Sequence, residues 1–400
     1  MYFLTHSYNH TNISKANLFS FIFYSYVTED GFEIDNVFER NLGAGLQRPT
    51  RKLLASDGID SDERGPSIFW IMSPMNSWID NVAAGSVHSG FWFETNFAVR
   101  HPSSQIDGAN GFVPSFQPVK KFKNNVVHSN SNFGIQYYNP GWKPKGPESV
   151  IEGSIVYRNR NGHFVHGNGN FVIKGGICAD HDTNVMAFEN YGYRIDGLTI
   201  YGHTQNYLDV LDYSRTWFNC KRDPDRMVRG VEIHPFNSFG TLNAQGHFEN
   251  LIFRGFDEGC PNAIPIKMSG TKVHNKVDFS SRSFVNTNFV GLGAETIRAN
   301  GCSGIGIESI AIHDKDGRIG GQPGTRGFIV GNETKITTFA NGDGCSEDPG
   351  LDCLQWCPNA CLRMIIVQVS NTVAMDNITM IISDGEKEEE ANFVHYDPPR

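Results

Sequence analysis

The chain lacks any apolar run near the about 18 residues that a membrane-spanning helix needs, so it encodes no span. Its amino-terminal stretch, MYFLTHSYNHTNISKANLFSFIFYSYV, lacks the basic n-region and small-residue cleavage site of a signal peptide. The motifs G-x-x-x-x-G-K-[ST], G-x-G-x-x-G, H-E-x-x-H and G-x-S-x-G are also missing. These absences leave nucleotide-binding proteins, zinc metalloproteases and α/β-hydrolases without support.

The chain also has no excess of basic residues over acidic ones. The 34 Lys and Arg residues face 43 Asp and Glu residues, for a formal net charge of −9. A nucleic-acid partner is disfavoured, because phosphate binding needs a basic face. An acidic polymer would need a locally basic surface. Residues 220–229, with Lys221 and Arg222, are one candidate, although a solvated loop with internal ion pairs explains them equally well.

What the chain has instead is a repeat of short strand-like runs. Three of these runs begin at Ser154, Gly176 and Gly197, so they recur at nearly equal intervals along the chain. A period of roughly 20 residues indicates stacked supersecondary units that cannot bury their apolar face alone. Short β-branched runs with Asn and Gly punctuation favour strands over helices. The sequence therefore predicts an all-β fold, a right-handed parallel β-helix (solenoid) with one coil per repeat.

Three ordered blocks carry a family resemblance. They are YVTEDGFEIDNVFERNLGAG (26–45), IFWIMSPMNSWIDNVAAGSVHSGFWFE (68–94) and IAIHDKDGRIGGQPGTRGFIVGN (310–332). They resemble blocks of the cell-migration-inducing hyaluronan-binding proteins, their cell-surface hyaluronidase relatives and the fibrocystins. The resemblance covers roughly residues 20–380 and implies a β-helix that handles hyaluronan or a related glycosaminoglycan. The G8 domain of that family would precede residue 1, so we expect a fragment or a divergent short member.

The expected organisation is one β-helix with long excursions. An N-terminal lead-in covers 1–19 and the β-helix covers 20–340. Insertions are expected at 47–66, 95–119, 139–148 and 204–229, followed by a cysteine-rich cap at 341–384 and an acidic disordered tail at 385–400.

The cysteines favour an oxidising compartment. Of eight cysteines, four crowd near the carboxyl end with spacings that do not match structural zinc sites. We expect these four to form two disulfides that staple the cap, and a further bridge between Cys220 and Cys260. With four N-x-[ST] sequons, this pattern predicts an extracellular protein, secreted or the ectodomain of a surface protein. The four cap cysteines are Cys345, Cys353, Cys357 and Cys361.

The repeat register predicts a charged wall. Equal offsets from three repeat starts should stack about 4.8 Å apart along a parallel solenoid. Acids, bases and cations in such a wall are what glycosidic cleavage requires. A structural alternative is an ion-paired ladder in which each Asp neutralises the Arg one coil away. The wall consists of Arg158, Asp180 and Tyr201 in one column, Arg160, Asp182 and His203 in the next, and His181 between them.

A second carboxylate cluster is a further catalytic candidate. Glu29 and Asp30, with Glu33 beside them, lie in a block that resembles the family, although an Asp-Gly turn with acidic flanks would look the same. His163 and His166 form another candidate pair, for metal binding or acid–base chemistry, and turn histidines also bond to backbone.

Two further segments are candidate ligand sites. Trp142 with Lys143 and Lys145, on a proline-bracketed loop, is a plausible glycan contact. Asp314 and Asp316 begin a D-x-D-G pattern typical of calcium loops, and the family resemblance strengthens calcium as a cofactor. A plain Asp-Gly turn is the alternative.

Three functions remain open at this point. The first is an extracellular β-helix that binds and hydrolyses hyaluronan or a related glycosaminoglycan. The second is a non-catalytic glycan-binding or adhesion ectodomain of the fibrocystin type, and the third is a polysaccharide lyase. Fold alone does not decide between them. We expect a monomer.

Overall fold

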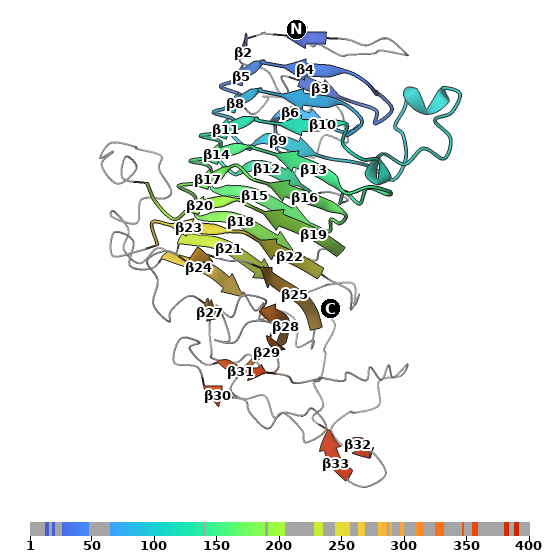
Figure 1. Cartoon of the computed structure of the whole chain (residues 1–400). Helices are drawn as coiled ribbons and strands as arrows, with labels where there is room; N and C mark the ends of the chain where they lie inside the picture. Colours follow the sequence, from blue (N-terminus) through green and yellow to red (C-terminus); the bar gives the residue numbers. More distant parts are fainter. Residues whose placement is uncertain are drawn as a thin grey trace.

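A computed structural model of the chain describes residues 13–15, 18–20, 26–47, 65–138, 141–188, 191–204, 228–234 and 245–256, and the backbone of the later strands named below. The strands wind into a right-handed parallel β-helix with three sheets, as the sequence predicted (Figure 1). Each rung of the helix contributes one strand to each sheet in the order sheet 1, sheet 2, sheet 3.

Sheet 1 is the longest. Its strands are β1 (Ile13–Lys15), β4 (Val37–Glu39), β7 (Ser77–Ile79), β10 (Lys121–Lys123), β13 (Ser149–Glu152), β16 (Phe171–Lys174), β19 (Tyr191–Asp196), β22 (Gln245–Glu249), β25 (Phe279–Val285), β28 (Ser309–Asp314), β29 (Thr325–Gly331), β31 (Leu354–Pro358) and β30 (Ser346–Glu347). Pairing is parallel from β1 to β28 and antiparallel from β28 onward. Parallel pairing in sheet 1 therefore extends to β28.

Sheets 2 and 3 complete the coil. Sheet 2 contains β2 (Leu18–Ser20), β5 (Leu42–Ala44), β8 (Val82–Ala84), β11 (Val126–His128), β14 (Ile155–Tyr157), β17 (Ile177–Ala179), β20 (Thr199–Tyr201), β23 (Ile252–Arg254) and β26 (Asn288–Phe289). Sheet 3 contains β3 (Tyr26–Thr28), β6 (Ser67–Ile71), β9 (Ser89–Phe93), β12 (Phe133–Tyr137), β15 (Asn161–His166), β18 (Thr183–Phe188), β21 (Val228–His234), β24 (Ala263–Met268) and β27 (Ile297–Ala299). A separate hairpin joins β32 (Met380–Ser383) to β33 (Glu388–Ala391), and the 3-10 helices η1 (Ser103–Gln105) and η2 (Pro114–Phe116) lie between β9 and β10.

A two-residue corner joins sheet 1 to sheet 2 on seven successive rungs. Its first residue is left-handed every time, with φ between 52° and 71°. Asn, Asp and Gly tolerate this conformation best, which explains the Asn and Gly punctuation seen in the sequence. The corner residues are Arg40, Asp80, Asn124, Gly153, Gly175, Gly197 and Asn250.

On the first three of these rungs, the second corner residue is an asparagine, and the three asparagines form a ladder of buried amides. The Asn81 Oδ1 atom accepts hydrogen bonds from the backbone N–H and the Nδ2 atom of Asn41, each at 3.0 Å. Asn125 accepts the same pair from Asn81, also at 3.0 Å. Asn81 Nδ2 also donates to the carbonyl of Phe38 at 2.9 Å. A buried polar group must be bonded to avoid a desolvation penalty, so each rung fixes the next.

Aromatic rings stack along the interior in the same way. The ring centroids of Tyr26 and Phe69 lie 4.6 Å apart and those of Phe69 and Phe91 lie 4.3 Å apart, and the ring planes of each pair are nearly parallel. A column of glycines at the start of the sheet 3 strands admits core side chains of sheet 2. A Cβ atom at Gly134 would lie 2.4 Å from Cγ1 of Val156, so only glycine fits there.

The ladder makes Asn81→Ala a sharp test of what holds the rungs together. Alanine would leave the buried donors of Asn41 without their acceptor, and we expect the free energy of unfolding to fall by about 3 kcal/mol. Exposed Lys174, on β16, provides the control, because Lys174→Ala should change that free energy by no more than about 0.5 kcal/mol. Urea unfolding followed by circular dichroism measures both. Equal effects would show that the ladder is dispensable.

Candidate functional site

The register expected for the residues of the charged wall holds on two rungs and is shifted by one residue on the third. Tyr157 pairs with Ala179, so Arg158 lies opposite Asp180. Ala179 pairs with Tyr201, so the residue opposite Asp180 is Gly202. Asn161 pairs with Thr183, which places Arg160 opposite Asp182.

The shift has a simple cause. Two adjacent glycines, Gly175 and Gly176, both suit a repeat start and both have positive φ, but the pairing of Ile177 with Thr199 places Gly175 opposite Gly197. The counterparts of Gly175 are Gly153 and Gly197, which lie at equal separations along the chain on either side. Tyr201 therefore belongs to the last position of its strand.

Asp180 follows the last residue of β17 and is buried, with 4% of its surface exposed. Its two carboxylate oxygens accept hydrogen bonds from the backbone N–H and the hydroxyl of Thr204, at 2.7 and 2.8 Å. Burial raises the pKa of Asp180, and the Thr204 bonds and the charges of Arg158 and His203 act against that rise. The carboxyl group is thus committed to holding the next rung.

His181 belongs to a second ladder, at the corner between sheets 2 and 3. Asn130 donates to Oδ1 of Asn159 from its backbone and side chain, both at 2.9 Å. Asn159 in turn donates its N–H to Nδ1 of His181 at 3.0 Å, and Nε2 lies 3.2 Å from the carbonyl oxygen of Val156. A neutral ring with its proton on Nε2 satisfies these two contacts, and the carbonyl oxygen of Asn159 also lies 2.9 Å from Nδ1.

This placement corrects the expectation that His181 and His203 face a ligand. His181 is fully buried, and its burial lowers the pKa of the ring to about 4, against the two backbone contacts. The register places His203 directly after His181 in the same ladder column, where it is also buried. Neither imidazole presents an open face to a substrate.

The arginines of the wall lie outward. Arg160 is exposed and Arg158 is half-buried. Asp182, one rung after Arg160, is buried, and its backbone N–H donates to the carbonyl of Arg160 at 3.0 Å. The wall therefore presents cations to solvent and keeps its carboxylates inside.

The Glu29, Asp30 and Glu33 cluster serves the backbone. Glu33 accepts hydrogen bonds from the N–H groups of Glu29, Asp30 and Gly31 at 2.6 to 3.0 Å. Burial raises the pKa of Glu33, and those donors act against the rise. Asp30 holds the excursion between β9 and β10, because its Oδ2 accepts from both the N–H and the hydroxyl of Ser103.

Trp142 is fully buried, which corrects the expectation that it stacks on a glycan. Its ring packs 5.1 Å from Phe93, and Nε1 donates to the carbonyl of Gln117 at 2.8 Å. The Lys145 ammonium lies 3.9 Å from the centre of the Phe116 ring, and the backbone N–H of Lys143 donates to Ser115. This segment thus fastens the excursion to the solenoid.

The candidate histidine pair is divided between two faces. His163 points into the core, where it lies 3.3 Å from the Tyr137 hydroxyl, and burial lowers the pKa of its ring to about 3. His166 lies on the outer side of sheet 3, stacked 4.1 Å from Tyr138. The two rings do not form a joint site.

Several sequence expectations fall outside the described residues, and they stay predictions. Asp314 ends β28, where only its backbone is described, as is that of Cys357 in β31. Within the described part of the chain, no group of three or more His, Cys, Asp or Glu side chains could hold a metal ion. The remaining residues in this set are Lys221, Arg222, Asp316, Cys220, Cys260, Cys345, Cys353 and Cys361.

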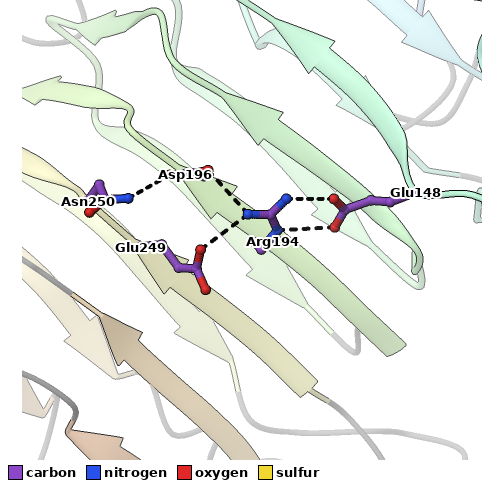
Figure 2. Close-up of polar contacts among 5 residues, drawn as sticks. All are labelled: Glu148, Arg194, Asp196, Glu249 and Asn250. Atoms are coloured by element: carbon purple, nitrogen blue, oxygen red, sulfur yellow. Dashed lines mark hydrogen bonds and ion pairs between the residues drawn. The ribbon is translucent and has the colours of Figure 1, made fainter.

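The outward face of sheet 1 is covered by ion pairs. Figure 2 shows Arg194 of β19 linking residues of three rungs: its guanidinium contacts Glu148 at 2.7 Å, and Asp196 and Glu249 at 3.2 Å each. Asn250 donates to Asp196 at 2.9 Å. Lys123 pairs with Glu152 on neighbouring strands at 3.2 Å. Ion pairs on this face thus link neighbouring strands of sheet 1.

The outward face of sheet 2 is different, and the sequence analysis missed it. The middle residue of each short strand points inward and the two flanking residues lie on the outer side, where Ala179 at the end of β17 is itself buried. None of the outward residues on β5, β8, β11, β14, β17, β20 and β23 is an Asp or Glu. We call these outward residues the sheet 2 face: Leu42, Ala44, Val82, Ala84, Val126, His128, Ile155, Tyr157, Ile177, Ala179, Thr199, Tyr201, Ile252 and Arg254.

Known proteins share the first rungs of this helix. Residues 3–135 match the CEMIP beta-helix family model. The resemblance expected from the sequence blocks is thereby confirmed for this part of the chain, which ends before the arginines of the wall. The chain is 31% identical to mouse fibrocystin-L over 130 residues, covering 32% of this chain and 3% of that protein.

Two other relatives carry hyaluronan in their names. The human cell migration-inducing and hyaluronan-binding protein is 31% identical over 130 residues, covering 28% of this chain and 9% of that protein. The zebrafish (Danio rerio) cell surface hyaluronidase is 34% identical over 130 residues, covering 27% and 9%. The chain thus spans a small part of the curated relatives that it matches. Within its described residues, no helix is long and apolar enough to cross a membrane.

The neutral His181 ring predicts acid sensitivity. Above pH about 6.5, neither the folded nor the unfolded ring is protonated. Between pH about 6.5 and about 4, the unfolded ring binds a proton that the folded ring does not, so the free energy of unfolding decreases as the pH falls. The total loss should reach about 3 kcal/mol.

His181→Asn places an amide at the ladder position that Asn130 and Asn159 occupy on the preceding rungs, and it is the matched comparison. We expect this variant to lose about 3 kcal/mol less than the wild type between pH 7 and pH 4, because His163 and the carboxyl groups titrate in both proteins. Urea titrations at a series of pH values measure the difference. Parallel pH profiles would show that His181 is not held neutral.

Proposed function

We propose that this chain is a glycan-binding β-helix ectodomain that holds an acidic glycosaminoglycan of the hyaluronan type. The observation that carries the proposal is the match of residues 3–135 to the CEMIP beta-helix model, together with relatives named for hyaluronan binding. The outward position of Arg158 and Arg160 supports it. Arginine forks suit carboxylates, and each uronic acid of such a polymer carries one.

Binding fits the described geometry better than catalysis does. Glycoside hydrolysis needs two carboxyl groups that face one sugar linkage about 5 to 9.5 Å apart. Both oxygens of Asp180 are taken by Thr204, and Asp30 and Glu33 bond to Ser103 and to turn amides. Extracellular placement and calcium at Asp314 and Asp316 belong to the same proposal.

Arg158 and Arg160 lie at the corner between sheets 2 and 3, which we call the arginine corner. Its role in binding is tested by Arg160→Ala. Loss of one charge-assisted hydrogen bond should weaken the binding of sized hyaluronan about tenfold, measured by isothermal titration calorimetry at fixed ionic strength. Lys174→Ala removes the same charge from the exposed surface of sheet 1 and should leave the Kd unchanged. Equal Kd values for the two variants would remove Arg160 from the site.

Hydrolysis is the second candidate, because relatives are named as hyaluronidases. Asp182 is the wall carboxylate that would serve as acid or base, and Asp182→Asn should then lower turnover by about 10²-fold while the melting temperature stays close to that of the wild type. Incubation with sized hyaluronan, with and without chelator, measures this. Shorter chains without absorbance at 232 nm indicate hydrolysis, new absorbance there indicates a lyase, and unchanged chains indicate a binder.

A further inference from the structure

We propose that the sheet 2 face binds an acidic polysaccharide lengthwise, with the sugar chain running parallel to the axis of the β-helix. The inference rests on the proposed function and extends it by naming the surface, the direction of the polymer and the repeat that it recognises. The arginine corner borders this face, because Arg158 directly follows Tyr157.

The first argument is charge. The chain carries a net charge of −9, yet no outward position on these strands holds a carboxylate. Arg254 lies on the face itself and is exposed, and Arg158 and Arg160 lie along its border. An anionic polymer that approaches sheet 1 meets acidic and basic side chains together, whereas none of the outward positions of the sheet 2 face carries an acid. The nearest carboxyl groups, Asp180 and Asp182, are buried one rung after Arg158 and Arg160.

The second argument is exposed apolar surface. Ile155 and Ile177, on neighbouring rungs, are 39% and 37% exposed, and Leu42 is 37% exposed further along the same column. A contiguous row of exposed aliphatic side chains marks a binding surface more often than scattered ones do. The C–H faces of pyranose rings can cover such a row while their hydroxyl groups stay in water.

The third argument is spacing. Tyr157 stacks on His128 at 4.7 Å with an interplanar angle of 10°, so its ring is held in place along the column. Ala179 follows Tyr157, and Tyr201 follows Ala179. The two tyrosines therefore stand two rungs apart, about 9.6 Å along the axis. That interval is close to the length of one disaccharide in a β-linked chain.

A polymer with a disaccharide repeat would place equivalent sugars at both tyrosines. Its alternate sugar, which carries the carboxylate in a glycosaminoglycan, would lie over the rung of Ala179, one rung from Arg158 and Arg160, which lie on the rung of Tyr157. The carboxyl groups of the Ala179 rung, Asp180 and Asp182, are buried. A neutral homopolymer of similar length would offer the two arginines no carboxylate.

Two variants that each add one carboxylate at a similarly exposed aliphatic residue test this proposal in the full chain. Ile177→Glu adds a carboxylate to the centre of the sheet 2 face, and Val150→Glu adds one to sheet 1 at a site of almost identical exposure, 38% against 37%. We expect the first to weaken binding of sized hyaluronan at least tenfold and the second less than twofold. Neutral dextran of the same length should bind neither the wild type nor the variants. Circular dichroism melting checks that both variants fold.

Each outcome decides a separate question. If the wild type binds hyaluronan and both variants bind it equally, the sheet 2 face is not the site and glycan binding itself stands. If the wild type does not bind, the proposed function and this inference both fail. If light scattering shows a wild-type dimer that Ile177→Glu dissociates without changing hyaluronan affinity, the face joins two copies of the chain and the inference is overturned. If Tyr157→Ala with Tyr201→Ala also weakens binding, the spacing argument is supported.

Discussion

Hydrogen bonds between side-chain amides on successive rungs are the interaction on which this solenoid depends. Each amide of the Asn41, Asn81 and Asn125 ladder satisfies the backbone and side chain of its neighbour. These groups are enclosed, so water does not replace a lost partner. The ladder therefore ties the position of one rung to that of the next, and every surface column inherits its alignment.

Whether a side chain points into the solenoid or out of it decides whether it supports the structure or is available to a ligand. Asp180, His181, Asp30 and Glu33 carry groups suited to catalysis, and each is engaged in hydrogen bonds that hold a turn, a rung or an excursion. The residues left for recognition lie on the outward positions of short strands. In such a fold, chemical reactivity of the residue type is a weaker guide than its orientation.

The sequence allowed the all-β solenoid and the family resemblance to be predicted, because strand length and the Asn and Gly residues at the turns between strands are local properties. It also placed Arg158 beside Asp180, where rungs are free of insertions. It failed at Tyr201 because Gly175 and Gly176 are indistinguishable until the strand register is known. It failed at Trp142 because burial by Phe93 depends on contacts between rungs. The absence of acids on the sheet 2 face emerges only after the register is known.

The short corner between sheets 1 and 2 has a further consequence. Gly153, Gly175 and Gly197 mark this corner on three rungs that follow one another at short, equal intervals of sequence. Asn41, Asn81 and Asn125 mark it on rungs that are separated by much longer stretches of chain. The extra residues leave the coil at the other two corners, and the sheet 2 strands stay one strand spacing apart. On the sheet 2 side, the distance between equivalent residues of successive rungs is therefore constant, however many residues separate them in the sequence.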